Sequence, residues 1–318
     1  MFYNLNKSNK ISAETIKEVK NIRRQYFKTD VYFQVVLNNG FVISFIIEDK
    51  VNTSHHSDQL QRYKIEIESD GEKEDEIVLI YYKTGYIFDW DNKAIDFGYS
   101  ILTAKLVSEF LEKYQIINPI FTDYKEYVKN INDFYQKAYK ELFSTNEGYK
   151  QFVYDFTQIE FMKELFNRCP DNVNNYHSVN NGKSIGGSPW TCLNFLYIEK
   201  MVNEFPEMLF YKLDQRANGF NISLRHYSYF KNSSNIDSAK KEKIKRLNFY
   251  IDIFNSIKAE EITKLQFGKI NRDLSGAFDS DIAVIYFDSD KNTVQNVLTE
   301  LPKFHKVFVN AVRKAMNL

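Results

Sequence analysis

Two carboxylates and a lysine stand at the two ends of a predicted β-hairpin near the start of the chain. Asp30 precedes one apolar run, an Asn-Asn-Gly turn follows, and a second apolar run leads directly into Glu48-Asp49-Lys50. An Asn-Gly turn between two apolar runs is typical of a hairpin. Because hairpin strands are antiparallel, Asp30 should lie beside the end of the second strand. Glu48 and Lys50 are two residues apart and so share one face.

This grouping suits metal-assisted hydrolysis of a phosphodiester bond. The carboxylates of Asp30 and Glu48 are hard oxygen ligands that favour Mg²⁺ or Mn²⁺. The backbone carbonyl of Asp49 would add a third oxygen, while its side chain points to the other face. A bound cation polarises a phosphate and lowers the pKa of water. The ammonium of Lys50 could orient or deprotonate that water, because burial and neighbouring positive charge readily lower a lysine pKa.

The spacing Asp30–x17–Glu48-x-Lys50 resembles the motif of the PD-(D/E)XK nuclease superfamily. The later pair Gln59 and Tyr63 is similar to the Gln-x3-Tyr motif of its RecB-like branch. The local sequences of residues 47–51 and 58–63 also resemble a bacterial family of this superfamily that is often found in defence loci. The resemblance covers roughly residues 10–115. A threonine precedes Asp30 where the superfamily motif has proline, a position without a ligand role.

The resemblance implies a fold, an activity and roles for several residues. The expected fold is α/β: a restriction-endonuclease-like αβββαβ core with a mixed sheet, followed by a C-terminal α/β appendage. The expected activity is Mg²⁺- or Mn²⁺-dependent cleavage of DNA, with RNA not excluded. Gln59 and Tyr63 would steady the active-site lysine or contact DNA. The alternative is structural, with Gln59 on the surface and Tyr63 in a core stripe of its helix.

An additional acid is common on the first helix of the superfamily. Ser12–Ile22 predicts such a helix, with an apolar stripe at every third residue. Glu18, or Glu14, could supply the acid, although a surface glutamate is the simpler alternative. Residues 1–28 hold seven Lys and Arg against two Glu. A set of basic residues near the predicted site could therefore meet phosphates, or simply be solvated: Arg23, Arg24, Lys28 and Arg62.

The remaining elements follow from apolar periodicity. In the first half we expect a helix from Gln59, a strand at Glu76–Tyr82 and a helix at Ser100–Tyr114. In the second half we expect helices at Tyr124–Phe143, Tyr149–Phe166, Ser238–Ile257 and Val294–Met316, strands at Leu209–Asp214, Phe220–Tyr227 and Ile282–Phe287, and a loop at Asp171–Pro189. We place the nuclease core at residues 1–145 and the α/β appendage at 146–318.

Composition limits the class of protein. The chain has 318 residues, 43% of them hydrophobic, and no net charge. This argues against a protein that binds nucleic acid by bulk charge, but a nuclease needs basic groups only along one cleft. Two cysteines without ligand spacing, Cys169 and Cys192, favour a reducing cytoplasm. We expect neither a signal peptide nor a membrane span, and His55-His56 should be loop residues near the substrate.

Two classes of function stay open. The first is an active endonuclease directed at foreign DNA. The second is a partner-gated or inactive nucleic-acid-binding or regulatory module on the same fold. Residues beyond about 145 could form a homodimer or bind a defence-system partner. The rival view is a monomer whose appendage extends the DNA cleft with Lys240, Lys241 and Lys243.

Overall fold

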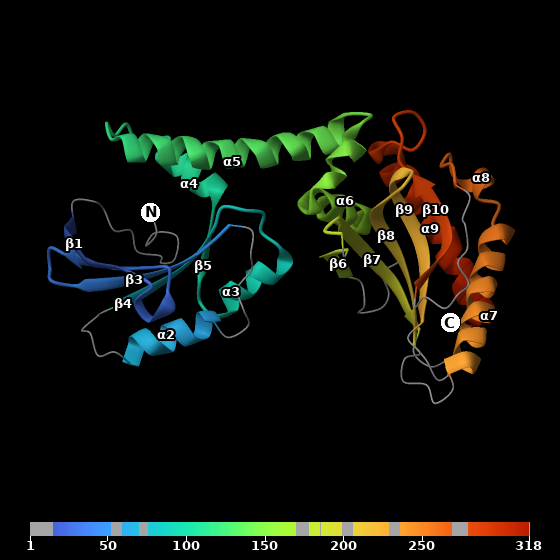
Figure 1. Cartoon of the computed structure of the whole chain (residues 1–318), viewed down its shortest axis with the longest axis horizontal. Helices are drawn as coiled ribbons and strands as arrows, with labels where there is room; N and C mark the ends of the chain where they lie inside the picture. Colours follow the sequence, from blue (N-terminus) through green and yellow to red (C-terminus); the bar gives the residue numbers. More distant parts are fainter. Residues whose placement is uncertain are drawn as a thin grey trace. The chain divides into compact units, whose positions relative to one another are not determined.

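The structure is a computed structural model of the whole chain. It describes residues 15–51, 59–69, 76–169, 178–184, 186–198, 206–228, 236–268 and 279–317. The chain divides into two units, residues 1–136 and 137–318. The division falls within one long helix, α5 (Pro119–Ser144), whereas the expected boundary at 145/146 falls just after it. Each unit is an α/β assembly built on its own five-stranded sheet (Figure 1).

The first unit contains a mixed sheet in the order β1-β2-β3-β4-β5. Its strands are β1 (Ile16–Arg24), β2 (Val31–Leu37), β3 (Val42–Lys50), β4 (Glu76–Lys83) and β5 (Ser100–Thr103). β2 is antiparallel to both of its neighbours, β1 and β3, whereas β4 is parallel to β3 and β5 is parallel to β4. The helices are the short 3-10 helices η2 (Tyr26–Lys28) and η3 (Asp89–Asn92), with α2 (Gln59–Ser69), α3 (Lys93–Asp96), α4 (Ala104–Leu111) and the first part of α5.

The predicted hairpin is confirmed. β2 and β3 pair in register, with Val31 opposite Ile47 and Val36 opposite Val42. Gly40 closes the turn with a positive φ of 84°, where a side chain would be strained. Its N–H donates to the Leu37 carbonyl at 2.9 Å. The hairpin therefore brings Asp30, next to Val31, beside the residue after Ile47, which is Glu48.

The helix predicted at Ser12–Ile22 is wrong over its described part. Residues from Ile16 onward form strand β1, which pairs with the open edge of β2. The apolar residues of the predicted stripe are largely exposed, with Val19 51% and Ile22 71% accessible. Two register shifts, one at Asn21 with a positive φ, disturb the alternation expected of a strand. The backbone hydrogen bonds that β1 forms with the edge of β2 therefore outweigh the helical spacing of its apolar residues.

The helix predicted at Ser100–Tyr114 is correct only from Ala104 to Leu111. Its first four residues form β5, which pairs in parallel with β4. Thr103 then caps the helix, its hydroxyl accepting the Leu106 N–H at 3.3 Å. The strand at Glu76–Tyr82 is confirmed and extends one residue further, to Lys83.

Helices cover both faces of this sheet, as Figure 1 shows, with α2 and α3 on one face and α4 and α5 on the other. The α2 face has a small core that includes Tyr32, Ile46 and Tyr81, all buried. The opposite face has a second core in which Val78 packs with Val128 of α5. Alternate residues of β3 therefore belong to different cores, as the two-residue period of a strand requires.

The second unit contains an antiparallel sheet in the order β10-β9-β8-β7-β6. Its strands are β6 (Ser178–Lys183), β7 (Pro189–Ile198), β8 (Glu207–Arg216), β9 (Gly219–Ser228) and β10 (Asp279–Tyr286). Its helices are the end of α5, the 3-10 helix η4 (Gly148–Val153), α6 (Asp155–Arg168), α7 (Ile236–Ser256), α8 (Ala259–Ile262) and α9 (Val294–Met316).

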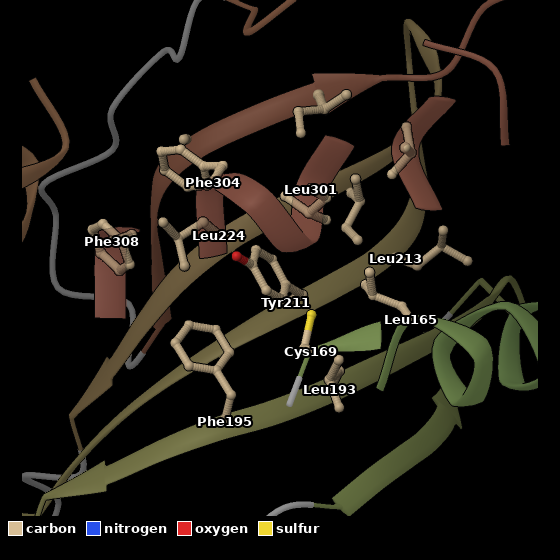
Figure 2. Close-up of a cluster of buried hydrophobic side chains, with 14 of the residues drawn as sticks. Leu165, Cys169, Leu193, Phe195, Tyr211, Leu213, Leu224, Leu301, Phe304 and Phe308 are labelled. Carbon is tan, nitrogen blue, oxygen red and sulfur yellow. The ribbon is translucent and has the colours of Figure 1, made fainter. Parts of the chain in front are cut away.

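The main core of this unit lies between the sheet and its helices. Leu165 of α6, Leu193 of β7, Tyr211 of β8 and Phe304 of α9 meet there, each buried, as Figure 2 shows. The three strands predicted in this half are confirmed, and the last helix begins and ends as predicted. The element at Tyr149–Phe166 is a 3-10 helix followed by α6 rather than one helix.

The loop predicted at Asp171–Pro189 is wrong in part, because residues 178–183 form the edge strand β6. The Asn- and Gly-rich sequence hid a strand whose partner, β7, is strongly apolar. In the part of the chain that is described, no helix is both long and apolar enough to cross a membrane.

Candidate active site

Asp30, Glu48 and Lys50 lie together at one edge of the first sheet. The Asp49 N–H donates to the Asp30 carboxylate at 2.7 Å, which fixes this side chain against the end of β3. Glu48 is fully buried on the α2 face of the sheet. The ammonium of Lys50, two residues further along the same face, forms an ion pair with the Glu48 carboxylate. The grouping predicted from the hairpin is thus present as a connected cluster.

Helix α2 adds Gln59 and Tyr63 to this cluster. The Gln59 amide nitrogen donates to Glu48 Oε1 at 2.9 Å and to the Tyr63 hydroxyl at 2.5 Å. Gln59 begins the helix, and Tyr63 follows one turn later on the same side. Only 2% of the Tyr63 surface is exposed. Gln59 is therefore not a free surface residue: it binds one oxygen of the Glu48 carboxylate directly, and Tyr63 binds Gln59.

Burial makes Glu48 an unusually basic carboxylate. Desolvation is the largest cause that raises the pKa of Glu48, Lys50 opposes the rise, and the negative charge of Asp30 adds to it; together these effects place the pKa at about 7. At pH 7 the Glu48 carboxyl is therefore about half protonated, and a bound cation would displace this proton. Such a shift at a buried carboxylate with defined partners is common in functional sites.

The two oxygens of this carboxylate differ in their hydrogen bonding. Glu48 Oε2 is buried and accepts no hydrogen bond from any residue that the structure describes, and the same holds for Gln59 Oε1. A buried carboxylate oxygen left without a donor costs free energy unless a ligand occupies it. No group of three or more acidic, His or Cys side chains is placed to hold a metal among the described residues. The groups that could hold a cation are fewer: the carboxylates of Asp30 and Glu48, whose charges act on each other.

That donor set fits Mg²⁺ or Mn²⁺. Mg²⁺ commonly takes only one or two carboxylates from the protein and keeps several waters. Glu48 Oε2, which has no described hydrogen-bond partner, belongs to a carboxylate next to that of Asp30. One oxygen from each carboxylate could therefore bind the same cation. All donors are oxygens, which favours these ions over softer metals.

The Asp49 side chain lies on the other face of the sheet, as expected. There burial raises the pKa of its carboxyl, and the charge of Asp30 adds to this rise. Asp49 acts electrostatically on Tyr82 and Tyr124, whose hydroxyls are 2.7 Å apart. Asp49 can thus contribute to the site only through its backbone.

Glu18, the expected additional acid, does not reach the site. It lies on strand β1, opposite Val36, and is exposed. Val36 is six residues from Asp30 along β2, which corresponds to about 20 Å at the rise of a strand. The prediction fails because the acid is on an edge strand, at the end remote from the carboxylates. Glu14, Ser12 and the pair His55-His56 lie outside the described residues.

The basic residues predicted to contact DNA are near the site but differ in setting. Arg24 pairs with Val31 and is exposed, as is Lys28. The Arg23 guanidinium lies 4.3 Å from the centre of the Tyr26 ring. Arg62 is exposed on α2 and forms a loose ion pair with Glu66 at 3.7 Å.

In the second unit, the expected extension of a DNA cleft by Lys240, Lys241 and Lys243 requires exposed ammonium groups, and Lys243 does not have one. It is 4% exposed, and its ammonium donates to the Ser280 hydroxyl at 3.1 Å. Lys241 is exposed and Lys240 partly so. The sequence shows three lysines on one basic helix but does not show that Lys243 faces the sheet.

Sequence inspection missed a second ion pair beside the first. Lys83 lies in register with Lys50 on the neighbouring parallel strand, and its ammonium binds Asp91 at 2.6 Å. Both side chains are fully buried. Asp91 also accepts the Tyr81 hydroxyl at 2.8 Å and the Phe88 N–H at 2.8 Å. The sequence signal that could have indicated this pair is Lys83, a charged residue at the end of the apolar strand β4.

Comparisons with models of protein families, with curated proteins and with solved structures returned no match.

Proposed function

We propose that this chain is a divalent-metal-dependent deoxyribonuclease with a restriction-endonuclease-like core in its first unit. The observation that carries the proposal is the buried Glu48 carboxylate. Lys50 and Gln59 bind one of its oxygens, the other has no described partner, and Asp30 adjoins it. A structural glutamate would gain nothing from an unpartnered buried oxygen beside a second carboxylate.

Each side chain has a role in hydrolysis of a phosphodiester. Asp30 and Glu48 would hold the cation, with the Asp49 carbonyl as a further oxygen. When bound, the cation supplies charge that polarises the phosphate and acidifies water. The Lys50 ammonium, 15% exposed, would orient the attacking water and place positive charge by the phosphate. Gln59 and Tyr63 position the Glu48 carboxylate from helix α2.

A cleavage assay tests this function. The full chain should cleave circular single-stranded DNA, nick supercoiled plasmid, or do both, in Mg²⁺ or Mn²⁺ and not in EDTA, while Ca²⁺ should permit binding without turnover. Glu48→Gln and Asp30→Asn should each lower the rate by about 100-fold or more, the usual effect of losing a positioned electrostatic group.

The matched control is Glu18→Gln, because Glu18 is an exposed glutamate of the same sheet that lies remote from the site. It should cleave at the rate of the unaltered chain. Undiminished cleavage by the Asp30→Asn/Glu48→Gln double variant, or robust cleavage in excess EDTA, would contradict the proposal.

A further inference from the structure

An aromatic stack lies in the segment that follows β4, the strand beside the one that ends at Lys50. The Phe88 and Trp90 rings are stacked, with centroids 4.4 Å apart and planes inclined by 8°. Tyr86 meets Phe88 edge-on, with centroids 5.0 Å apart. Despite this packing, 37% of the Trp90 surface is exposed. A tryptophan that served only to fill a core would be buried, whereas the Trp90 indole is exposed on an ordered aromatic stack.

The stack is held rigidly by buried charges. The Asp91 carboxylate accepts the Phe88 N–H and binds Lys83, whose ammonium lies 4.9 Å from the centre of the Phe88 ring. The Lys83–Asp91 pair is fully buried, so its position is fixed by packing and by hydrogen bonds. Phe88 and Trp90 are therefore preorganised before any ligand arrives.

The same contacts place the stack at the edge of the sheet where the site lies. β3 and β4 are parallel and end together, with Lys50 in register with Lys83, about one strand spacing apart. The N–H of Thr84, the residue directly after β4, donates to the Lys50 carbonyl at 3.1 Å. The segment that carries the stack thus starts at the catalytic lysine itself.

Charge at the stack does not favour a phosphate contact. The exposed Asp89 and Lys93 flank it with opposite signs, and Asp91 is neutralised by its buried lysine. A flat aromatic surface with little net charge suits the face of a nucleobase better than the backbone. Stacking of a base on an aromatic ring contributes substantially to the binding of single strands and depends little on base identity.

We propose that Trp90, supported by Phe88, stacks on an unpaired nucleobase next to the scissile phosphate, so that the substrate of this site is single-stranded DNA. This inference rests on the proposed nuclease function and specifies its substrate. A base within an intact duplex has both faces covered by its neighbours and could not reach the stack.

Binding of oligonucleotides in EDTA measures the stack without cleavage. The full chain should bind a fluorescent 20-nucleotide oligo-dT more tightly than an abasic strand of equal length and charge, or a 20-base-pair duplex. Trp90→Ala should weaken oligo-dT binding about 5- to 140-fold, the loss of one stacked base. Binding of the abasic strand should not change. Trp90→Phe should recover most of the affinity, whereas Trp90→Leu should not.

Salt dependence and fluorescence separate stacking from charge. The fold-change caused by Trp90→Ala should be the same at low and high salt, while that caused by Arg62→Ala should shrink as salt rises. The chain has two tryptophans, Trp90 and Trp190. In a Trp190→Phe background, oligo-dT should quench the remaining indole and the abasic strand should not. An oligo-rU arm tells whether the stack accepts RNA as well.

The outcomes distinguish this inference from the proposed function. Unchanged oligo-dT affinity in Trp90→Ala, with no quenching, overturns the stacking role even if Mg²⁺-dependent cleavage is present and lost in Glu48→Gln. Equal weakening of oligo-dT, abasic strand and duplex also overturns it. Absence of any metal-dependent cleavage by the unaltered chain would instead remove the nuclease function on which the inference rests.

Discussion

The Gln59 amide nitrogen lies 2.9 Å from Glu48 Oε1, across the space between helix α2 and the end of strand β3. Lys50 binds the same oxygen. One carboxylate oxygen is therefore held from two elements, while the other, Oε2, faces no described donor. Holding one oxygen fixes the direction in which the second points. Residues that orient a ligand in this way affect metal affinity without touching the metal.

Gln59→Leu should weaken metal binding without unfolding the chain. The change removes the donor to Glu48 and to the Tyr63 hydroxyl but keeps a side chain of similar size. The Mg²⁺ concentration for half-maximal cleavage should rise about 10- to 100-fold. Gln61→Leu is the matched control, because Gln61 is exposed on the same helix. An unchanged Mg²⁺ requirement in Gln59→Leu would show that this residue has no positioning role.

Cleavage should depend on the protonation of Glu48. Its pKa of about 7 means that the carboxylate needed by a cation is lost as pH falls below 7. At limiting Mg²⁺ the rate should fall about tenfold per pH unit below that point, and more Mg²⁺ should move the profile to lower pH. Rates that are flat from pH 5.5 to 8 at limiting Mg²⁺ would contradict this.

The same pKa has a consequence for stability. A carboxyl with a raised pKa holds its proton more tightly in the folded chain than in the unfolded one between pH 4.5 and about 7. Glu48 therefore lowers the free energy of unfolding as pH rises through this window. Glu48→Gln removes that dependence. In urea unfolding, the free energy of unfolding of the variant minus that of the unaltered chain should therefore be larger at pH 8 than at pH 5. A constant difference across this range would be the contrary result.

Asp91→Ala should destabilise the first unit strongly. The change leaves the Lys83 ammonium buried without its carboxylate, and it also removes the acceptor of the Tyr81 hydroxyl. Breaking a buried ion pair by removing one partner costs about 3–5 kcal/mol. Asp89→Ala, at an exposed position, should change the free energy of unfolding by about 0.5 kcal/mol or less. Urea denaturation measures both, and a loss below about 1 kcal/mol in Asp91→Ala would count against a structural pair.

The second unit should lose stability in acid through His226. Burial lowers the pKa of this histidine, although Glu207 lies 2.8 Å from its Nε2. The unfolded chain then binds the proton more readily below pH 6.5, so the free energy of unfolding falls as pH falls. Lys243 and Arg246, close to the ring, act in the same direction. The melting temperature of the unaltered chain relative to His226→Gln should drop between pH 7.5 and 5.5, and a constant difference would contradict this.

Local signals were enough to place the grouping of Asp30, Glu48 and Lys50. The Asn-Gly turn sets the register of the hairpin, and the two-residue period of a strand sets the face. Gln59 and Tyr63 were within reach for a similar reason, since residues four apart share one side of a helix. These relationships span few residues, so the order of residue types already contains them.

Tertiary structure decided the features that depend on distant partners. Residues 16–24 carry a helical period but form a strand, because the edge of β2 offers backbone hydrogen bonds that the period does not record. That change moved Glu18 away from the carboxylates. Only the parallel pairing of β4 with β3 sets Lys83 beside Lys50, and the segment with the Phe88–Trp90 stack follows Lys83. Burial decided the pKa of Glu48, because desolvation depends on everything packed around a carboxylate and not on its neighbours in sequence.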